Sequence, residues 1–166
     1  METEALPALE TAREALRLAT KKSLLIATAE SCTGGVIAAT ITEIAGCSSA
    51  FERGFVTYSN DSKIELLGVP AEILESAGAV SEPTARAMAE GALAHSRADV
   101  AVAVTGIAGP DGGTPEKPVG LVHLAAARHG CPTLHRVERF PGDRAAVRAA
   151  TARTAFQMLS EILGRD

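Results

Sequence analysis

The chain has 166 residues and a formal net charge of −4, from 16 basic and 20 acidic side chains. Hydrophobic residues make up 46% of the chain and aromatic residues only 3%, which indicates a globular protein with an aliphatic core. The few aromatic residues and the scattered basic residues argue against direct nucleic-acid binding, and no apolar run approaches the roughly 20 residues of a membrane span.

The hydrophobic periodicity predicts an alternation of helices and strands. In chain order we expect a helix over 4–20, a strand over 23–29, a helix over 33–45, a strand over 51–59, helices over 61–67, 70–77 and 82–97, a strand over 99–105, a loop over 106–118, strands over 119–128 and 132–140, and a helix over 143–163. Ser81 is the expected N-cap of the helix over 82–97, with Pro83 in its first turn.

This order predicts an α/β fold, with an antiparallel pair formed by the last two strands. We expect a three-layer α/β/α single domain over residues 1–166, with a mixed sheet of about five strands. Ligands of such folds bind at the carboxyl ends of the strands, so the glycine-rich turns at that edge are candidate binding sites.

The cysteines and the N-terminus indicate the compartment. The odd number of cysteines, none of them in a CxxC motif, and an acidic N-terminus without the features of a signal peptide predict a reduced, cytoplasmic protein. No pair of His or Cys residues has the spacing of zinc ligands, so no metal site is expected.

The first candidate motif is AESCTGG, over residues 29–35, between a predicted strand and a predicted helix. It places Ser31 and the neighbouring Cys32 at a helix N-terminus, where free N–H groups stabilise a phosphate or a developing oxyanion. Either side chain is a candidate nucleophile, although at most one of two neighbours on a turn faces a cleft. An ordinary turn with a helix-capping hydroxyl is the structural alternative.

The second motif is VTYSNDSK, over residues 56–63, which holds the only Tyr of the chain, Tyr58, together with Lys63. A lysine acts as a general base only if its pKa falls from about 10.4 to about 7–8. Burial beside apolar side chains lowers the pKa in this way. The alternative is a solvated lysine on a helix surface and a tyrosine that serves only in packing.

The third motif is TGIAGPDGG, over residues 105–113, followed by KPVG. Four glycines directly after a buried strand favour a backbone cradle for an anion or a flat ring. The spacing matches neither a Walker P-loop nor a dinucleotide-binding turn, and a long surface loop remains the alternative.

These segments, in this order and together with LLGV and GAVSE, resemble the CinA C-terminal domain family, the nicotinamide-nucleotide amidohydrolases also called PncC. The resemblance runs from about residue 24 to the end of the chain and indicates a free-standing domain of this type. Two departures affect the expected phosphate pocket: the stretch before the Ser pair is Ala45-Gly46-Cys47, and Arg53 stands where the family often has Gly.

The resemblance implies hydrolysis of the carboxamide of nicotinamide mononucleotide by Ser31, assisted by Lys63 and Tyr58, without a metal or other cofactor. In the expected mechanism Lys63 takes the Ser31 proton, directly or through Tyr58, and the oxyanion is held by N–H groups near 33–35 or from Gly106 onward. The substrate-binding positions that it implies are Glu30, Thr33, Gly34, Gly35, Ser48, Asn60, Thr105, Gly106, Ala108 and Gly109.

For the charged parts of the substrate, Glu30 is the expected neighbour of the pyridinium ring, and Arg53 or Lys117 is expected at the phosphate. A nucleotide is the expected partner, without direct nucleic-acid or membrane contact, and the Ala-rich helices suggest a homo-oligomer. A non-catalytic nucleotide-binding module, or an adaptor linked to competence and DNA damage, remains the alternative.

Overall fold

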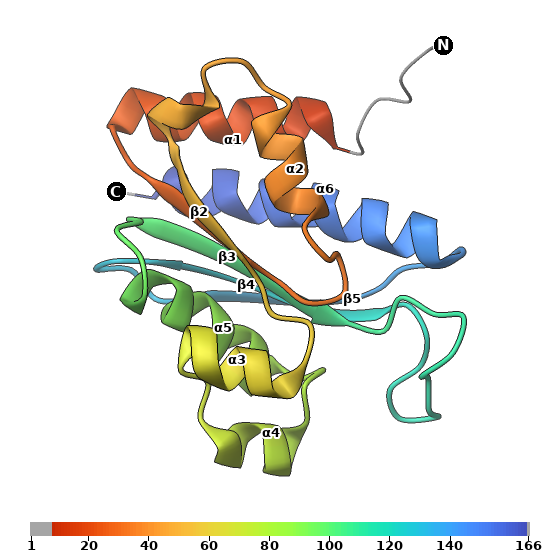
Figure 1. The fold of residues 1–166 in the computed structure, drawn as a ribbon. Helices are drawn as coiled ribbons and strands as arrows, with labels where there is room; N and C mark the ends of the chain where they lie inside the picture. Colours follow the sequence, from red (N-terminus) through yellow and green to blue (C-terminus); the bar gives the residue numbers. More distant parts are fainter. Residues whose placement is uncertain (1–7, 166) are drawn as a thin grey trace.

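The computed structural model describes residues 8–165, which form a five-stranded sheet covered by helices on both faces (Figure 1). The strands are β1 (Ile26–Glu30), β2 (Phe51–Val56), β3 (Val100–Gly106), β4 (Leu121–Arg128) and β5 (Leu134–Arg139). In the order β2-β1-β3-β4-β5, β1 is parallel to β2 and β3, while β4 is antiparallel to both β3 and β5. The predicted α/β class, mixed sheet and antiparallel last pair are confirmed.

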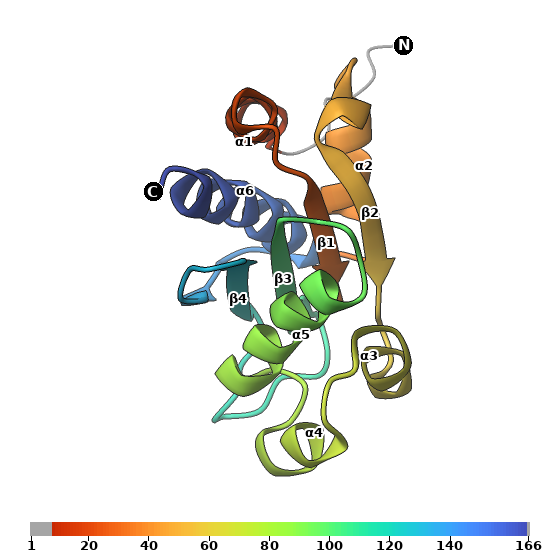
Figure 2. The same cartoon turned by 90° about the vertical axis from the view of Figure 1, so that its left-hand side faces the viewer.

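Helices lie on both faces of the sheet, as Figure 2 shows. They are α1 (Leu9–Lys22), α2 (Val36–Thr42), α3 (Asn60–Leu67), α4 (Ala71–Ala77), α5 (Glu82–Ala94) and α6 (Arg144–Leu163), with a short 3-10 helix η1 (Cys47–Ser49) before β2. Helix α6 packs on β3 and β4, and α1 lies over α6 and α2, while α5 packs on the opposite face. None of the helices in residues 8–165 is long and apolar enough to cross a membrane.

The sheet separates two apolar clusters. The cluster under α1, α2 and α6 is built from long aliphatic side chains and Phe156, whereas the cluster under α5 consists mostly of alanines with Met88. Alanines on the sheet let α5 approach closely, and α3 in turn lies against α5 at Gly91, where a Cβ atom would overlap the Leu67 carbonyl oxygen. The small side chains therefore place α3 at the carboxyl edge of the sheet.

The helix predicted over 33–45 is shorter than expected and comprises only Val36–Thr42. Gly34 and Gly35 have φ angles of 57° and 105°, which lie outside the right-handed helical region. The two glycines turn the chain after β1, and the buried Glu30 carboxylate then binds the first N–H groups of the helix.

Other predicted boundaries differ by a few residues. The first helix begins at Leu9, and the part predicted over 4–7 lies outside the described residues. Strand β2 ends at Val56 because the chain turns into α3, where Ser59 caps the helix by accepting a hydrogen bond from the Ser62 N–H. Helix α5 begins as predicted, with Ser81 accepting from the Thr84 N–H, and ends at Ala94.

Candidate active site

The site lies at the carboxyl ends of the two central parallel strands. Ser31 directly follows β1, and its N–H donates to the Val104 carbonyl of β3 over 3.1 Å. On the other side, the Thr57 N–H donates to the Glu30 carbonyl over 2.8 Å, which keeps the chain beside β1 as it leaves β2. This connection brings α3, and with it Lys63, to the turn that carries Ser31.

The Lys63 amine is buried and contacts the Ser31 hydroxyl. The residue is 1% exposed, and its Nζ lies 3.0 Å from Ser31 Oγ, 2.7 Å from the Thr57 carbonyl oxygen and 3.3 Å from the Tyr58 carbonyl oxygen. No carboxylate lies within salt-bridge distance of this amine in residues 8–165. Burial therefore lowers the pKa of Lys63 from 10.5 to about 8.

These contacts give the neutral amine one orientation. A neutral amine has two N–H donors and one lone pair, and the carbonyl oxygens of Thr57 and Tyr58 can accept the two hydrogens. The lone pair then faces Ser31 Oγ, ready to accept the hydroxyl proton. Because this contact is direct, the arrangement requires no relay through the Tyr58 hydroxyl.

A cavity of about 220 Å³ opens onto this pair of side chains. It is lined by Ser31, Cys32, Tyr58, Lys63, Ala79, Val80, Thr105, Gly106, Ala108 and Arg144. The segment after α4 forms one wall, held by a 2.8 Å hydrogen bond from Thr105 Oγ1 to the Ala79 carbonyl. Three segments distant in sequence, each of which contains one of the predicted motifs, thus meet around one cavity.

Tyr58 forms the outer wall of this cavity. It is 62% exposed, and its hydroxyl oxygen lies 3.2 Å from Nη2 of Arg144 at the start of α6. The same guanidinium donates through Nη1 to the Gly109 carbonyl over 2.9 Å. Arg144 therefore joins the segment after β2 to the loop after β3 across the cavity mouth.

Glu30 occupies a different place from the one expected for a pyridinium-binding residue. Its carboxylate is fully buried and accepts hydrogen bonds from Thr33 Oγ1 and from the N–H groups of Gly35, Ile37 and Ala38, over 2.7–3.2 Å. It does not line the cavity. Glu30 instead stabilises the N-terminus of α2, where a negative charge is favourable.

Replacing Glu30 is therefore expected to change stability. In Glu30→Gln one acceptor oxygen becomes an NH₂ donor that faces N–H groups, and hydrogen bonds to charged groups contribute about 1.5–3 kcal/mol each. We expect the free energy of unfolding to fall by about 3 kcal/mol, measured by urea denaturation. The matched variant at the exposed Glu43, Glu43→Gln, should change it by less than about 0.5 kcal/mol. Equal stability of the two variants would contradict this role of Glu30.

The other predicted binding residues are divided between the cavity and other parts of the molecule. Thr105, Gly106 and Ala108 line it, and Gly109 holds Arg144 through its carbonyl group. Around the nucleophile turn, Thr33 donates to Glu30 and Gly34 and Gly35 form the bend, whereas Asn60 is exposed at the start of α3. None of these last four residues lines the cavity.

Three predicted residues lie away from the site or are otherwise engaged. Ser48 belongs to η1, next to the amino end of β1, where the Ile26 N–H donates to the Ala50 carbonyl. Arg53 pairs with the adjacent Glu52 on β2 and does not line the cavity at Ser31. Lys117 donates to the Ala77 carbonyl over 2.8 Å and supports the end of α4 instead of the cavity.

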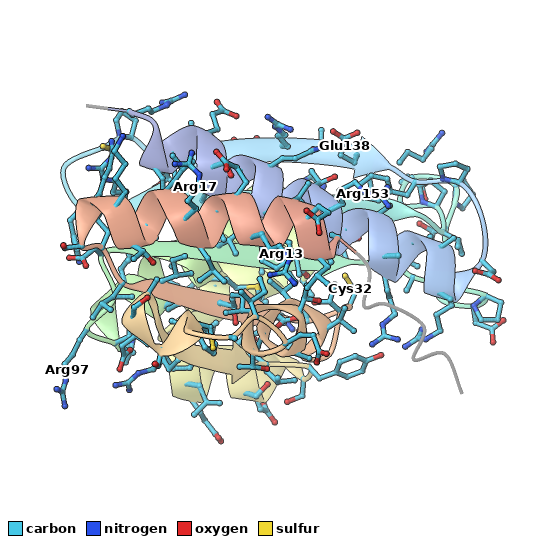
Figure 3. All side chains as sticks on the ribbon, turned by 90° about the horizontal axis from the view of Figure 1, so that it is seen from above. Arg13, Arg17, Cys32, Arg97, Glu138 and Arg153 are labelled. Carbon is cyan, nitrogen blue, oxygen red and sulfur yellow. The ribbon has the colours of Figure 1, made fainter. Side chains whose placement is uncertain are left out.

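The alternative nucleophiles have unfavourable surroundings. Cys32 lies beside Ser31 near the start of α2 (Figure 3), but burial raises the pKa of its thiol to about 12, so the reactive thiolate is scarce at neutral pH. None of the four histidines lines the cavity. His123 and His135 instead contact each other across β4 and β5 over 3.0 Å, a pairing that their sequence spacing did not predict.

Arginines of α6 near the cavity were missed by the sequence analysis. Arg144 lines the cavity, and Arg148 donates to the Thr33 carbonyl over 2.8 Å, beside the turn that carries Ser31. Both lie more than 100 residues from that turn, and their helix was predicted only as a closing helix. The single sequence signal was their i, i+4 spacing, which places both on one helix face.

No group of three or more His, Cys, Asp or Glu side chains in residues 8–165 is arranged to hold a metal.

Comparison with known families gives one match over nearly the whole chain: residues 9–163 match the model of the CinA C-terminal domain. The chain is also similar in structure to the competence/damage inducible protein CihA from Agrobacterium tumefaciens. That comparison has a TM-score of 0.92 and 53% sequence identity, and covers 95% of this chain and 96% of that one.

Relatives of two lengths are found among named proteins. The nicotinamide-nucleotide amidohydrolase PncC of Escherichia coli K12 is 55% identical over 134 residues, which are 81% of each chain. A CinA-like protein of Akkermansia muciniphila is 56% identical over 82% of this chain, and one of Geobacter sulfurreducens is 54% identical over 86%. The chain spans only about a third of these two longer proteins, 33% and 34% of their lengths.

Proposed function

The chain belongs to the CinA C-terminal domain family, and on that premise we propose that it is an amidohydrolase that converts nicotinamide mononucleotide to nicotinic acid mononucleotide and ammonia. The observation that carries the proposal is the buried Lys63 amine, 3.0 Å from the Ser31 hydroxyl in a cavity at the sheet edge. The similarity to a named nicotinamide-nucleotide amidohydrolase supports the choice of substrate.

The first half of the reaction transfers the acyl group to Ser31. Neutral Lys63 removes the hydroxyl proton while Ser31 Oγ attacks the carboxamide carbon, giving a tetrahedral oxyanion. The Lys63 ammonium then donates this proton to the amide nitrogen. The C–N bond breaks, ammonia leaves, and an ester of Ser31 remains.

Backbone N–H groups next to Ser31 are the proposed oxyanion donors. Those of Ser31, Gly34 and Gly35 are already bonded to other groups of the protein. The N–H groups of Cys32 and Thr33 donate to no other residue in the range 8–165, and they belong to the same turn as the nucleophile. Donors fixed in position before the reaction stabilise the developing charge without reorganisation.

The second half of the reaction releases the acid. Lys63, neutral again after ammonia has left, takes a proton from water as the water oxygen attacks the ester carbonyl. The second tetrahedral intermediate collapses, and Ser31 Oγ leaves with the proton returned by Lys63. The products are a carboxylic acid and the original hydroxyl, so one lysine acts as base and acid in each half-reaction.

The test is ammonia release from nicotinamide mononucleotide by the purified protein, with EDTA present. We expect ammonia and nicotinic acid mononucleotide in equal amounts, because the proposed nucleophile, base and oxyanion donors are all protein groups. A nucleotide-dependent rise in melting temperature without ammonia release would instead favour a nucleotide-binding module. If the protein neither released ammonia nor gained thermal stability with the nucleotide, both functions would be overturned.

A further inference from the structure

Two histidines meet on the face of the sheet that α5 covers. His123 belongs to β4 and His135 to β5, and the strand register places them diagonally opposite one another, because His123 is opposite Val137, two residues after His135. Nδ1 of His123 lies 3.0 Å from Nε2 of His135, whereas the ring centres are 5.2 Å apart and the ring planes are inclined by 25°. The two rings therefore meet edge to edge through one N–H···N hydrogen bond.

Within residues 8–165, three charged side chains face this histidine pair from the elements packed against it. Glu82, the first residue of α5, has a carboxylate oxygen 3.6 Å from Nδ1 of His135. Arg86, one turn later, pairs with this carboxylate over 2.8 Å and opposes a proton on His135. Lys117, in the loop before β4, opposes a proton on His123. These surroundings accommodate one added positive charge beside Glu82 and disfavour a second.

The histidine pair lies behind one wall of the cavity at Ser31. Ala79 and Val80, which line that cavity, come directly before the N-cap of α5. The Ala79 carbonyl accepts the hydrogen bond from Thr105, which is the cross-strand neighbour of His123. A change in the contacts between β4, β5 and α5 therefore reaches the segment that forms this wall.

The contact between the two rings tolerates one added proton and no more. A neutral imidazole has one N–H and one lone pair, so two neutral rings can form the hydrogen bond. One added proton still leaves a donor and an acceptor at the contact, and the Glu82 carboxylate balances its charge. A second added proton turns all four ring nitrogens into donors, so two N–H groups and two positive charges face each other over 3.0 Å. The hydrogen bond is then lost.

This contact suits a shared proton better than a metal ion. The pair offers two nitrogen ligands, and no third His, Cys, Asp or Glu in residues 8–165 completes a metal-binding group with them. A metal ion does not fit on the line between the two nitrogens, because they are 3.0 Å apart and each metal–nitrogen bond is about 2.0–2.1 Å long. Arg86 and Lys117 also add positive charge beside the rings.

We propose that His123 and His135 form an acid-sensitive link between the β4–β5 hairpin and α5, which holds with at most one added proton and breaks with the second. Burial supports this proposal, because it lowers the pKa of both imidazoles below the ordinary 6.5, and the charge of His135 lowers the pKa of His123 further. As the pH falls below about 6.5, the unfolded chain therefore binds more protons than the folded protein. Acid destabilises the fold through this pair.

Nuclear magnetic resonance of the imidazole groups tests the link in the wild-type protein and requires no substrate. The chain has four histidines, so substitution of each by Gln in turn assigns the signals. We expect the signals of His123 and His135 to change together in two separate steps, the second at a lower pH than proton uptake by the same residues in the urea-unfolded chain. Uptake of both protons at the pH found for the unfolded chain would overturn the proposal.

A stability measurement uses a double variant and a matched control. In His123→Gln/His135→Gln no titrating ring remains at the contact, while glutamine side chains can still donate and accept a hydrogen bond. Between pH 7 and pH 5 the melting temperature of the wild type should fall by about 5 °C more than that of the double variant. His129→Gln, which removes an exposed imidazole from the turn between β4 and β5, should follow the wild type. Equal falls in the wild type and the double variant would contradict the link.

Discussion

Ser31→Ala is expected to lower kcat for ammonia release by at least about a thousandfold, while the nucleotide still binds. The substitution removes the one hydroxyl in residues 8–165 that contacts the Lys63 amine, and it leaves no atom at that position able to form the ester intermediate. The change in volume is small, and the Ser31 N–H can still donate to Val104. Product binding, measured by calorimetry, should therefore stay within a few-fold of the wild-type affinity.

Cys32→Ala is the matched control for this experiment. Its thiol lines the same cavity, but its raised pKa of about 12 keeps it protonated near neutral pH. Activity within a few-fold of the wild type is expected. An inactive Cys32→Ala protein combined with an active Ser31→Ala protein would assign the nucleophile to the thiol and contradict the proposed mechanism.

The fold was largely predictable because its central elements have simple patterns. Strand β3 is a continuous apolar run with turn residues on both sides, as a strand buried on both faces requires. The helix predicted over 33–45 differs at both ends, and its start at Val36 depends on a side-chain contact. Propensity cannot show that the Glu30 carboxylate binds the N–H groups of Gly35, Ile37 and Ala38 and so sets where α2 begins.

The candidate site was predictable only where its residues are concentrated in short motifs. Ser31 and Lys63 occur in two such segments, and the strand order explains why they meet: β1 and β2 are parallel neighbours whose carboxyl ends lie at one edge. Arg144 and Arg148 stand alone in an ordinary helical pattern. Only the packing of α6 on β3 and β4 brings them to that edge.

Ser48 and Arg53 show where a family resemblance is a poor guide to position. Ser48 belongs to η1, directly before β2, and Arg53 belongs to β2 itself, and the resemblance suggested that each helps to bind the substrate. A strand has two ends, however, and the hydrogen bond between Ile26 and Ala50 places this region at the amino end of the sheet. Linear proximity to a site motif therefore did not indicate spatial proximity to the site.

Lys63→Met is expected to lower kcat by about 100- to 10,000-fold, the usual contribution of a general base. Methionine fills a similar volume in the buried site but has no lone pair suited to accept the Ser31 proton. Lys63→Arg should be equally impaired, because a guanidinium does not lose its proton near neutral pH. Recovery of wild-type activity in the arginine variant would show that the positive charge, and not the base, is what matters.

The pH dependence gives a more specific signature of the same group. With a pKa of about 8, only about a tenth of Lys63 is neutral at pH 7. The kcat/KM of the wild-type protein should therefore rise about tenfold per pH unit below pH 8 and level off above it. The residual kcat/KM of Lys63→Met should not show this rise with pH. A rise with the same midpoint pH in both proteins would assign the titration to a group other than Lys63.

Stability should change with pH in the same direction. The pKa of Lys63 is lower in the folded protein than the ordinary 10.5, so between about pH 8 and 10.5 the unfolded chain binds more protons and folding becomes more favourable as the pH rises. Relative to Lys63→Met, the free energy of unfolding of the wild type should increase by about 3 kcal/mol across this range. Urea denaturation of both proteins at several pH values measures the difference. A constant difference would show that Lys63 has an ordinary pKa in the folded state, and the neutral amine required for catalysis would then be rare.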